Sequence, residues 1–268
     1  MTAGCVAALA AAAMAQEAAP PPLLTADARL GGAWITGGAL RDAETARGTQ
    51  VGFGRDLDLD APAPAGTIAL HARLGGAWRA SAELSWTSFE GRAVQGGGSV
   101  FNPTPPTLTF DGTSFTGQTL ESELDLLLGA IGIWKRLGPL DDATMELGVG
   151  AHGIAADLTI GAVGGPEVDE RSVAITPWFG GVLESPLTRW LHAELGGRLG
   201  FLWGGDSVHY HVHALVELWA GVAVPLGPLR LGARVDWRLV DTQERAHGRD
   251  ELLDVSLVVA SVTAGMRF

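Results

Sequence analysis

The chain has 268 residues, of which 47% are hydrophobic, 18% are charged and 38 are glycine, and its formal net charge is -12. Such an acidic chain is a poor candidate for nucleic-acid binding, because that binding depends on Lys and Arg contacts to phosphate. No uncharged apolar stretch of about 18 residues follows residue 15, so the sequence does not predict a membrane-spanning helix. If the chain crosses a membrane, it does so with strands.

The first 15 residues carry no charge and end in Ala13-Met14-Ala15, a pattern typical of a signal peptide cleaved before Gln16. The usual basic start is missing, and Cys5 could instead end a lipoprotein signal, although almost nothing would precede it. Cys5 is the only cysteine, so cleavage after Ala15 would leave no internal disulfide. We therefore predict a signal peptide at 1–15, a proline-rich periplasmic linker at 16–25 and one domain at 26–268.

Beyond the linker, apolar and polar residues alternate along most of the chain, which is the period of a strand with two unlike faces. The alternation predicts ten strands, at 26–35, 67–76, 79–89, 119–134, 144–156, 172–184, 190–203, 208–224, 229–240 and 252–268. Thr49–Asp58 and Thr107–Phe115 could add two more strands, so twelve is the main alternative and eight a further one. The predicted fold is an all-β, closed, antiparallel, up-and-down transmembrane β-barrel.

The connections support this prediction, because their lengths alternate. Short links lie near 75–78, 136–142, 184–189 and 225–228, and longer or more polar ones lie at 37–65, 90–118, 157–171, 204–207 and 241–251. Membrane barrels of bacteria have short periplasmic turns and longer outer loops. An even number of strands would place both chain ends in the periplasm.

Alternation alone does not say which face points inward, but a membrane barrel turns its apolar face to lipid and keeps a polar lumen. We predict an ion-paired lumen network, and therefore no wide pore, from Glu121, Glu123, Asp125, Glu194, Arg198, Arg230, Arg234, Asp236 and Arg238. Tryptophans near strand ends predict the interfacial girdle of such a barrel, formed by Trp34, Trp86, Trp134, Trp203 and Trp237.

The chain ends on a strand whose outward residues are Val262, Ala264, Met266 and Phe268. In this feature the sequence resembles the bacterial outer-membrane protein superfamily, whose last strand ends in an aromatic residue that the barrel-assembly machinery reads. The resemblance implies an integral protein of a Gram-negative outer membrane. Its partners would be lipid, lipopolysaccharide and, through those four residues, the assembly machinery, but the resemblance implies no activity.

Two groups of residues could carry chemistry. His209, His211 and His213 share one face of a strand and could bind Zn²⁺, Cu²⁺ or Ni²⁺ with Asp206 or Glu217, although we favour a simple polar lining. Asp56, Asp58 and Asp60 also alternate and could do acid/base work or bind Ca²⁺, although an acidic segment facing solvent or the lipopolysaccharide cation layer is favoured.

Together, the three aspartates with Asp206 and His209 resemble the omptin proteases, which are ten-stranded barrels with aspartate pairs and an Asp-His pair near the outer rim. The Asp-x-His spacing of that family is absent, because Asp206 and His209 lie three residues apart, so no catalytic role is carried over. No cofactor is expected, and an enzyme is the less favoured reading. The leading hypothesis is a barrel of structural or surface-interaction type that presents loops 37–65 and 90–118 to a partner. A narrow small-solute channel is the first alternative, and a hydrolase at the outer rim is the second.

Overall fold

The structure is a computed structural model that describes residues 23–43, 50–96, 98–99, 102–103, 107–110, 113–140, 143–205, 210–246 and 249–268. The predicted signal peptide and residues 16–22 of the predicted linker lie outside these ranges. The first strand begins at Leu24, two residues before the predicted domain boundary.

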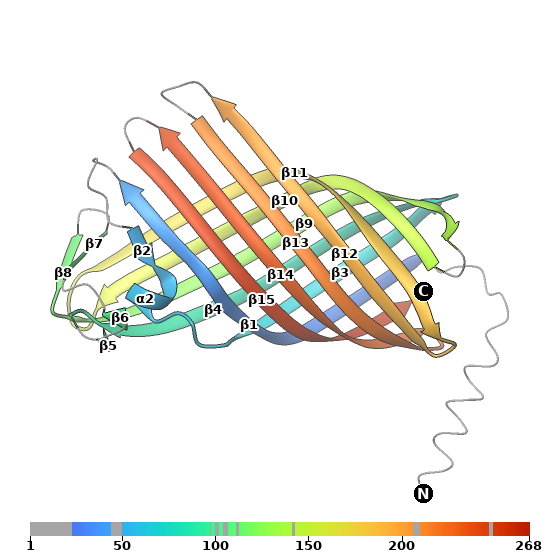
Figure 1. The fold of residues 1–268 in the computed structure, drawn as a ribbon, viewed down its shortest axis with the longest axis horizontal. Coiled ribbons are helices and arrows are strands. Elements are labelled where there is room, and N and C mark those ends of the chain that lie inside the picture. Colours follow the sequence, from blue (N-terminus) through green and yellow to red (C-terminus); the bar gives the residue numbers. More distant parts are fainter. Residues whose placement is uncertain are drawn as a thin grey trace, which may run out of the picture.

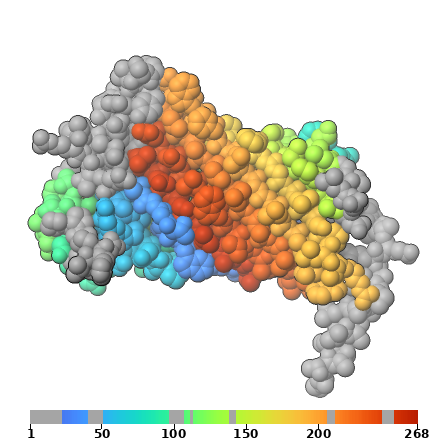
Figure 2. Space-filling view, viewed as in Figure 1, coloured from blue at the N-terminus to red at the C-terminus, as the bar shows by residue number. Residues whose placement is uncertain are grey.

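Ten antiparallel strands form a closed barrel (Figure 1). The strands are β1 (Leu24–Ala43), β3 (Ala63–Gly75), β4 (Trp78–Val94), β9 (Thr119–Leu140), β10 (Ala143–Ala162), β11 (Glu167–Thr188), β12 (Leu191–Gly205), β13 (Tyr210–Leu226), β14 (Leu229–Ala246) and β15 (Arg249–Arg267). Each strand pairs with its neighbour in sequence around the ring, and β15 pairs with β1 along Thr25–Ala43 to close it. Figure 2 shows this seam, where β15 residues in red lie against β1 residues in blue. Closure removes every free strand edge, as a sheet in hydrocarbon requires.

The ten predicted strands are confirmed, and the alternative of twelve is wrong. Residues 50–57 form the short strand β2 (Gln50–Gly52), which pairs with β1, and the helix α2 (Phe53–Leu57). The strands β7 (Thr107–Phe110) and β8 (Thr113–Thr116) pair with each other in a separate hairpin. A third small pair joins β5 (Gly98–Ser99) to β6 (Asn102–Pro103). All of these lie at one end of the barrel (Figure 1), which we call the loop end, and Phe268 lies at the other, which we call the terminal end.

The strands are longer than the alternation predicts, and the connections at the loop end are correspondingly shorter. The link between β10 and β11, expected at 157–171, contains only residues 163–166. β11 has 22 residues, which at about 3.3 Å per residue and a tilt of about 45° rise roughly 50 Å along the barrel axis. Because the apolar band of such barrels is about 25 Å tall, the wall extends well beyond it toward the loop end.

The middle of the outer surface is apolar. Large aliphatic side chains are exposed there on successive strands, among them Leu30, Ile68, Ile131, Val149, Ile175 and Leu195. A water-soluble barrel would turn these residues inward, so the outer surface is suited to lipid. No helix in the described part of the chain is long and apolar enough to span a membrane.

For one strand, β9, the sequence predicts the wrong inward face. Glu121, Glu123 and Asp125 of β9 are exposed on the outer surface, and they are not part of the lumen network. The alternation on β9 is the reverse of the prediction, so Trp134 points into the lumen with 1% of its surface exposed and cannot belong to an interfacial girdle. The other four predicted girdle residues lie on the outer face: Trp34, Trp86 and Trp203 are exposed, and Trp237 is half-buried beside Ser256.

Candidate functional site in the barrel lumen

Five buried charged side chains form what we call the lumen network. Glu83 of β4 accepts hydrogen bonds from Arg29 of β1 and from Arg198 of β12, each at 3.3 Å. Glu217 of β13 accepts a 2.9 Å hydrogen bond from Arg198 and lies 3.1 Å from the Nε of Arg238 of β14. The Nη2 of Arg238 also lies 3.6 Å from Glu83, and every side chain in the network is at most 6% exposed. β4 and β12 are not neighbours in the ring, so the network bridges the lumen.

A second group of charges lies next to this network. Arg234 donates to Asp236 through Nε at 2.7 Å, and its Nη1 lies 3.4 Å from Glu194. Glu194 also accepts a 2.8 Å hydrogen bond from the indole N–H of Trp219 and a longer one, 3.5 Å, from Arg230. Buried charges are stable only when they are paired and hydrogen-bonded, and here each carboxylate has at least one arginine partner.

Three tryptophans pack inside the barrel against the guanidinium group of Arg198. Its central carbon lies 5.3 Å from the ring centres of Trp178 and Trp219 and 5.9 Å from that of Trp134, at which distances cation–π attraction operates. Trp134 and Trp178 contact each other with their ring centres 5.1 Å apart. Arg198 therefore joins the buried tryptophans to the lumen network.

Glycines on the inner face make room for these rings. A Cβ atom at Gly148 would overlap the ring of Trp134, and one at Gly196 would overlap the ring of Trp219. The absence of a side chain at these two positions therefore leaves the space that the indole rings fill. A side chain larger than glycine at either position would displace an indole or the strand opposite it.

A cavity of about 340 Å³ lies between this layer and the terminal end. Its mouth includes Gly76 and Ala77 of the β3–β4 turn, and its inner lining includes Glu83, Arg198 and Trp219. We call this cavity the vestibule. Its lining reaches the lumen network through Arg29, Glu83 and Arg198.

Above the network, toward the loop end, the lumen is filled by apolar side chains. Helix α2 with the two residues after it and the strands β7 and β8 form what we call the outer cap, residues 53–59, 107–110 and 113–116. The cap buries six large side chains, each at most 1% exposed: Phe53, Leu57, Leu59, Leu108, Phe110 and Phe115. They belong to one cluster with inward residues of the wall such as Phe89, Leu124 and Leu158.

Polar contacts fix the cap to the wall. Ser122 of β9 donates a 3.0 Å hydrogen bond to the carbonyl of Leu57, and the Gln95 side chain donates one of 3.4 Å to the carbonyl of Asp56. The buried carboxylate of Asp56 accepts hydrogen bonds from the backbone N–H of Gly52 and from Arg55, at 2.7 Å each. Through that hydrogen bond, Asp56 raises the pKa of the Arg55 guanidinium above its ordinary value.

The structure places six of the nine predicted network residues in the lumen, namely Glu194, Arg198, Arg230, Arg234, Asp236 and Arg238. The partners of these arginines are different from the predicted ones, because the β9 carboxylates face outward. Glu83 and Arg29 were not predicted, although alternation along 26–35 and 79–89 puts each of them on the polar face of its strand. Glu217 was noted on the inner face only as a possible metal ligand.

The predicted metal and catalytic groups are not assembled in the described residues. The rings of His211 and His213 stack with their centres 5.7 Å apart, while His209 and Asp206 lie outside the described residues. No group of three or more His, Cys, Asp or Glu side chains in the described ranges could hold a metal ion. Asp56, Asp58 and Asp60 do not alternate along a strand, because residues 53–57 are helical, and only Asp56 is buried.

Comparison with known proteins gives a match in structure alone. No protein-family model and no curated protein matches the sequence. Among solved structures, the outer membrane protease OmpT from Escherichia coli is similar over 95% of this chain and 99% of its own, with a TM-score of 0.61 and 12% identity. The translocator domain of the autotransporter NalP from Neisseria meningitidis matches over 99% and 95% of the two chains, with a TM-score of 0.43 and 14% identity.

Ail, the attachment invasion locus protein of Yersinia pestis, matches over 91% and 99% of the two chains, with a TM-score of 0.34 and 10% identity. At these identities the similarity shows the fold alone, and of these three matches the one to OmpT has a TM-score above 0.5. The closed ten-stranded ring, its apolar outer surface and this match identify the architecture as that of a Gram-negative outer-membrane β-barrel.

Proposed function

We propose that the protein is a non-conducting barrel of the bacterial outer membrane that stabilises the envelope or presents its loop end to a partner. The observation that carries this proposal is the double closure of the lumen, by the lumen network and by the outer cap. Either layer alone excludes a water-filled path, because its side chains are buried against one another. The terminal end would face the periplasm and the loop end the outside of the cell.

Single-channel recording in planar bilayers tests the closure. We expect no stable conductance from the folded full-length protein, whereas a stable large conductance would overturn the proposal. Because the two closures lie in series, opening one should not be enough. The double substitution Arg198→Ala with Glu217→Ala, and replacement of residues 107–116 by a Gly-Ser linker, should each remain non-conducting, and only their combination should conduct.

The exposed face of the cap supports a role in surface interaction. The β7–β8 hairpin turns Leu108, Phe110 and Phe115 into the barrel and lines its other face with hydroxyl groups. Thr107 pairs with Thr116 at 3.1 Å and Thr109 pairs with Ser114 at 3.0 Å, so this face is a small ordered hydroxyl surface. Such a surface on a rigid support is suited to hydrogen bonding with a partner outside the cell.

Cysteine labelling tests which end lies outside. The only cysteine lies in the predicted signal peptide, so single cysteines can be added without a background label. In intact cells, Ser114→Cys should react with a membrane-impermeant maleimide, and the buried neighbour Phe115→Cys should not. Gly76→Cys in a turn of the terminal end should react only after the outer membrane is permeabilised. Labelling of Gly76→Cys in intact cells would reverse the proposed orientation.

The last strand supports the proposed contact with the assembly machinery. Val262, Ala264, Met266 and Phe268 are all exposed on the outer face of β15, at the terminal end. Phe268→Ala should reduce the fraction of protein that reaches the heat-modifiable, barrel form in membranes. Ser256→Ala on the same strand and face serves as the control, and equal effects of the two substitutions would count against an end signal.

A further inference from the structure

The vestibule concentrates positive charge in an acidic protein. Its lining includes eight arginines and five carboxylates, an excess of three positive charges, while the whole chain carries a formal charge of -12. The eight arginines are Arg29, Arg73, Arg79, Arg136, Arg198, Arg230, Arg234 and Arg267. A concave site with an excess of one sign of charge attracts small ions of the opposite sign.

The excess of positive charge lies at the mouth of the vestibule. The innermost arginines are held by Glu83, Glu217, Glu194 and Asp236, as described above. Nearer the turn, Arg73 donates only to the backbone carbonyl of Gly76, at 3.3 Å, and within the described residues neither Arg73 nor Arg267 has a carboxylate within 4.0 Å. Arg136 lies 3.6 Å from Glu146, but Arg79 contacts the same carboxylate more closely. The guanidinium groups of Arg73, Arg136 and Arg267 therefore have N–H donors available for a ligand.

We propose that the vestibule binds a small soluble oxyanion from the periplasm, a molecule with two or more carboxylate or phosphate groups. Arg73, Arg136 and Arg267 would bind it at the mouth, since a guanidinium group can donate two parallel hydrogen bonds to a carboxylate or phosphate. The proposal goes beyond that of a closed barrel and does not depend on what the loop end does.

The shape of the pocket limits the ligand to a small molecule. About 340 Å³ is near the lower limit of typical ligand pockets, and the lumen network closes its inner end. Aromatic stacking contributes little, because Arg79 covers the face of Trp134 and Arg234 covers that of Trp219, at 5.2 and 4.6 Å from the ring centres. Charge and hydrogen bonding would therefore dominate recognition.

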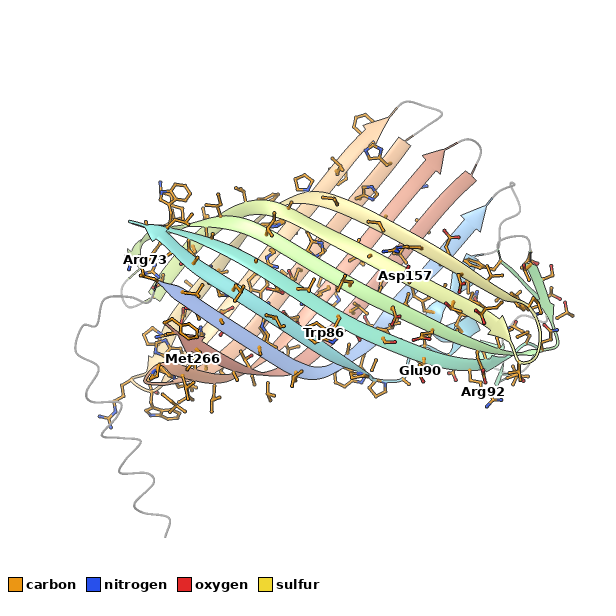
Figure 3. The ribbon with its side chains drawn as sticks, turned by 180° about the vertical axis from the view of Figure 1, so that it is seen from behind. Arg73, Trp86, Glu90, Arg92, Asp157 and Met266 are labelled. Atoms are coloured by element: carbon orange, nitrogen blue, oxygen red, sulfur yellow. The ribbon has the colours of Figure 1, made fainter. Side chains whose placement is uncertain are left out.

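Isothermal titration of the detergent-folded full-length protein with citrate, and separately with inorganic phosphate, tests the proposal. We expect saturable citrate binding that weakens as salt is added, weaker binding of phosphate at the same site by competition, and none of sucrose. Arg73→Gln combined with Arg136→Gln should weaken citrate binding by at least about tenfold, as expected for the loss of charge-assisted hydrogen bonds. The matched control is Arg92→Gln, an exposed arginine at the opposite end of the barrel from Arg73 (Figure 3).

Heat-modifiable gel migration shows whether each variant is folded, so that loss of binding is not confused with loss of the barrel. Non-saturable citrate binding by the wild-type protein, or an equal loss of affinity in Arg92→Gln and in the double variant, would overturn the proposal. Saturable binding that only the vestibule substitutions weaken would support it, whichever result the conductance experiment gives.

Discussion

The two halves of the lumen differ in what fills them. Toward the terminal end the interior holds arginines, carboxylates and three tryptophans, whereas toward the loop end it holds aliphatic and phenylalanine side chains. The outer surface changes in the opposite direction, from charged residues near the loop end to apolar residues further along. On β9 the outward residues run from Glu121, Glu123 and Asp125 near the loop end to Ile131 and Ile133 further along the strand.

The difference shows that the face on which charged side chains lie depends on what surrounds the barrel wall. Within the apolar band, lipid surrounds the wall and polar groups must be paired inside. Beyond the band, water surrounds the wall, so charges point out and apolar side chains pack inside, as in a soluble barrel. The ten strands run through both surroundings without a break, and the preferred face for charge reverses along them.

The largest expected effect comes from the lumen network. Glu217→Ala removes the carboxylate that Arg198 and Arg238 share and leaves both buried cations with fewer partners. Loss of one member of a buried ion pair typically costs about 3–5 kcal/mol. We expect a loss of that size in the free energy of unfolding, measured by urea titration in lipid vesicles.

The matched comparison is Glu123→Ala on the outer wall. Glu123 is exposed, and it accepts a long hydrogen bond of 3.4 Å from Ser88. The change should cost less than about 0.5 kcal/mol, as most exposed substitutions do. If Glu123→Ala cost as much as Glu217→Ala, the proposed division between the inner and outer faces would be wrong.

The next effect is in the apolar half of the lumen. Leu124→Ala removes a fully buried side chain from the cluster beneath the cap and should cost about 2–4 kcal/mol in unfolding free energy, through lost contacts and a residual cavity. Its neighbour Leu127 on the same strand is 46% exposed on the outer surface. Leu127→Ala should cost much less, and the opposite order would mean that β9 has its faces reversed.

The same strand explains which parts of the fold could be predicted from sequence. Period-two alternation gives the number and order of strands, because it depends only on each strand having two unlike faces. Alternation identifies the inner face only if charged residues point to the same side along the whole strand. The prediction takes Glu121, Glu123 and Asp125 as inward because they are charged, but they lie where water surrounds the wall and point outward. Trp134 is on the opposite face of the same strand, so its predicted position is reversed as well.

The partners within the lumen could not be predicted for a different reason. Which carboxylate meets Arg198 depends on the shear and tilt of the closed ring, which bring β4 opposite β12, and alternation says nothing about either quantity. The vestibule could not be predicted for the same reason, since its arginines come from seven strands: β1, β3, β4, β9, β12, β14 and β15. Helix α2 was missed because its buried residues Phe53 and Leu57, together with Leu59 after the helix, fit the alternation of a strand.

A smaller effect is expected where the cap is held by polar contacts. Asp56→Ala leaves the backbone N–H of Gly52 and the guanidinium of Arg55 without their acceptor, which should cost about 1–2 kcal/mol of unfolding free energy. Asp60→Ala, an exposed carboxylate that follows the same helix, should have little effect. If the two substitutions proved equal, the carboxylate of Asp56 would not be what holds α2 in the cap.

The smallest effect should come from an ion pair that has the same chemistry as the lumen network but lies in water. Arg171 and Asp157 are 3.4 Å apart on the outer wall of β11 and β10, with side chains 70% and 52% exposed. Solvent and salt screen such a pair, so Arg171→Gln should change the unfolding free energy by no more than about 0.5 kcal/mol. Arg198→Gln breaks contacts of similar length in the lumen and should cost several times more, because nothing there replaces the lost charge. A large loss in Arg171→Gln that added salt does not reduce would instead show that this part of the wall is shielded from water, and the reversal of the burial rule along β10 and β11 would then not hold.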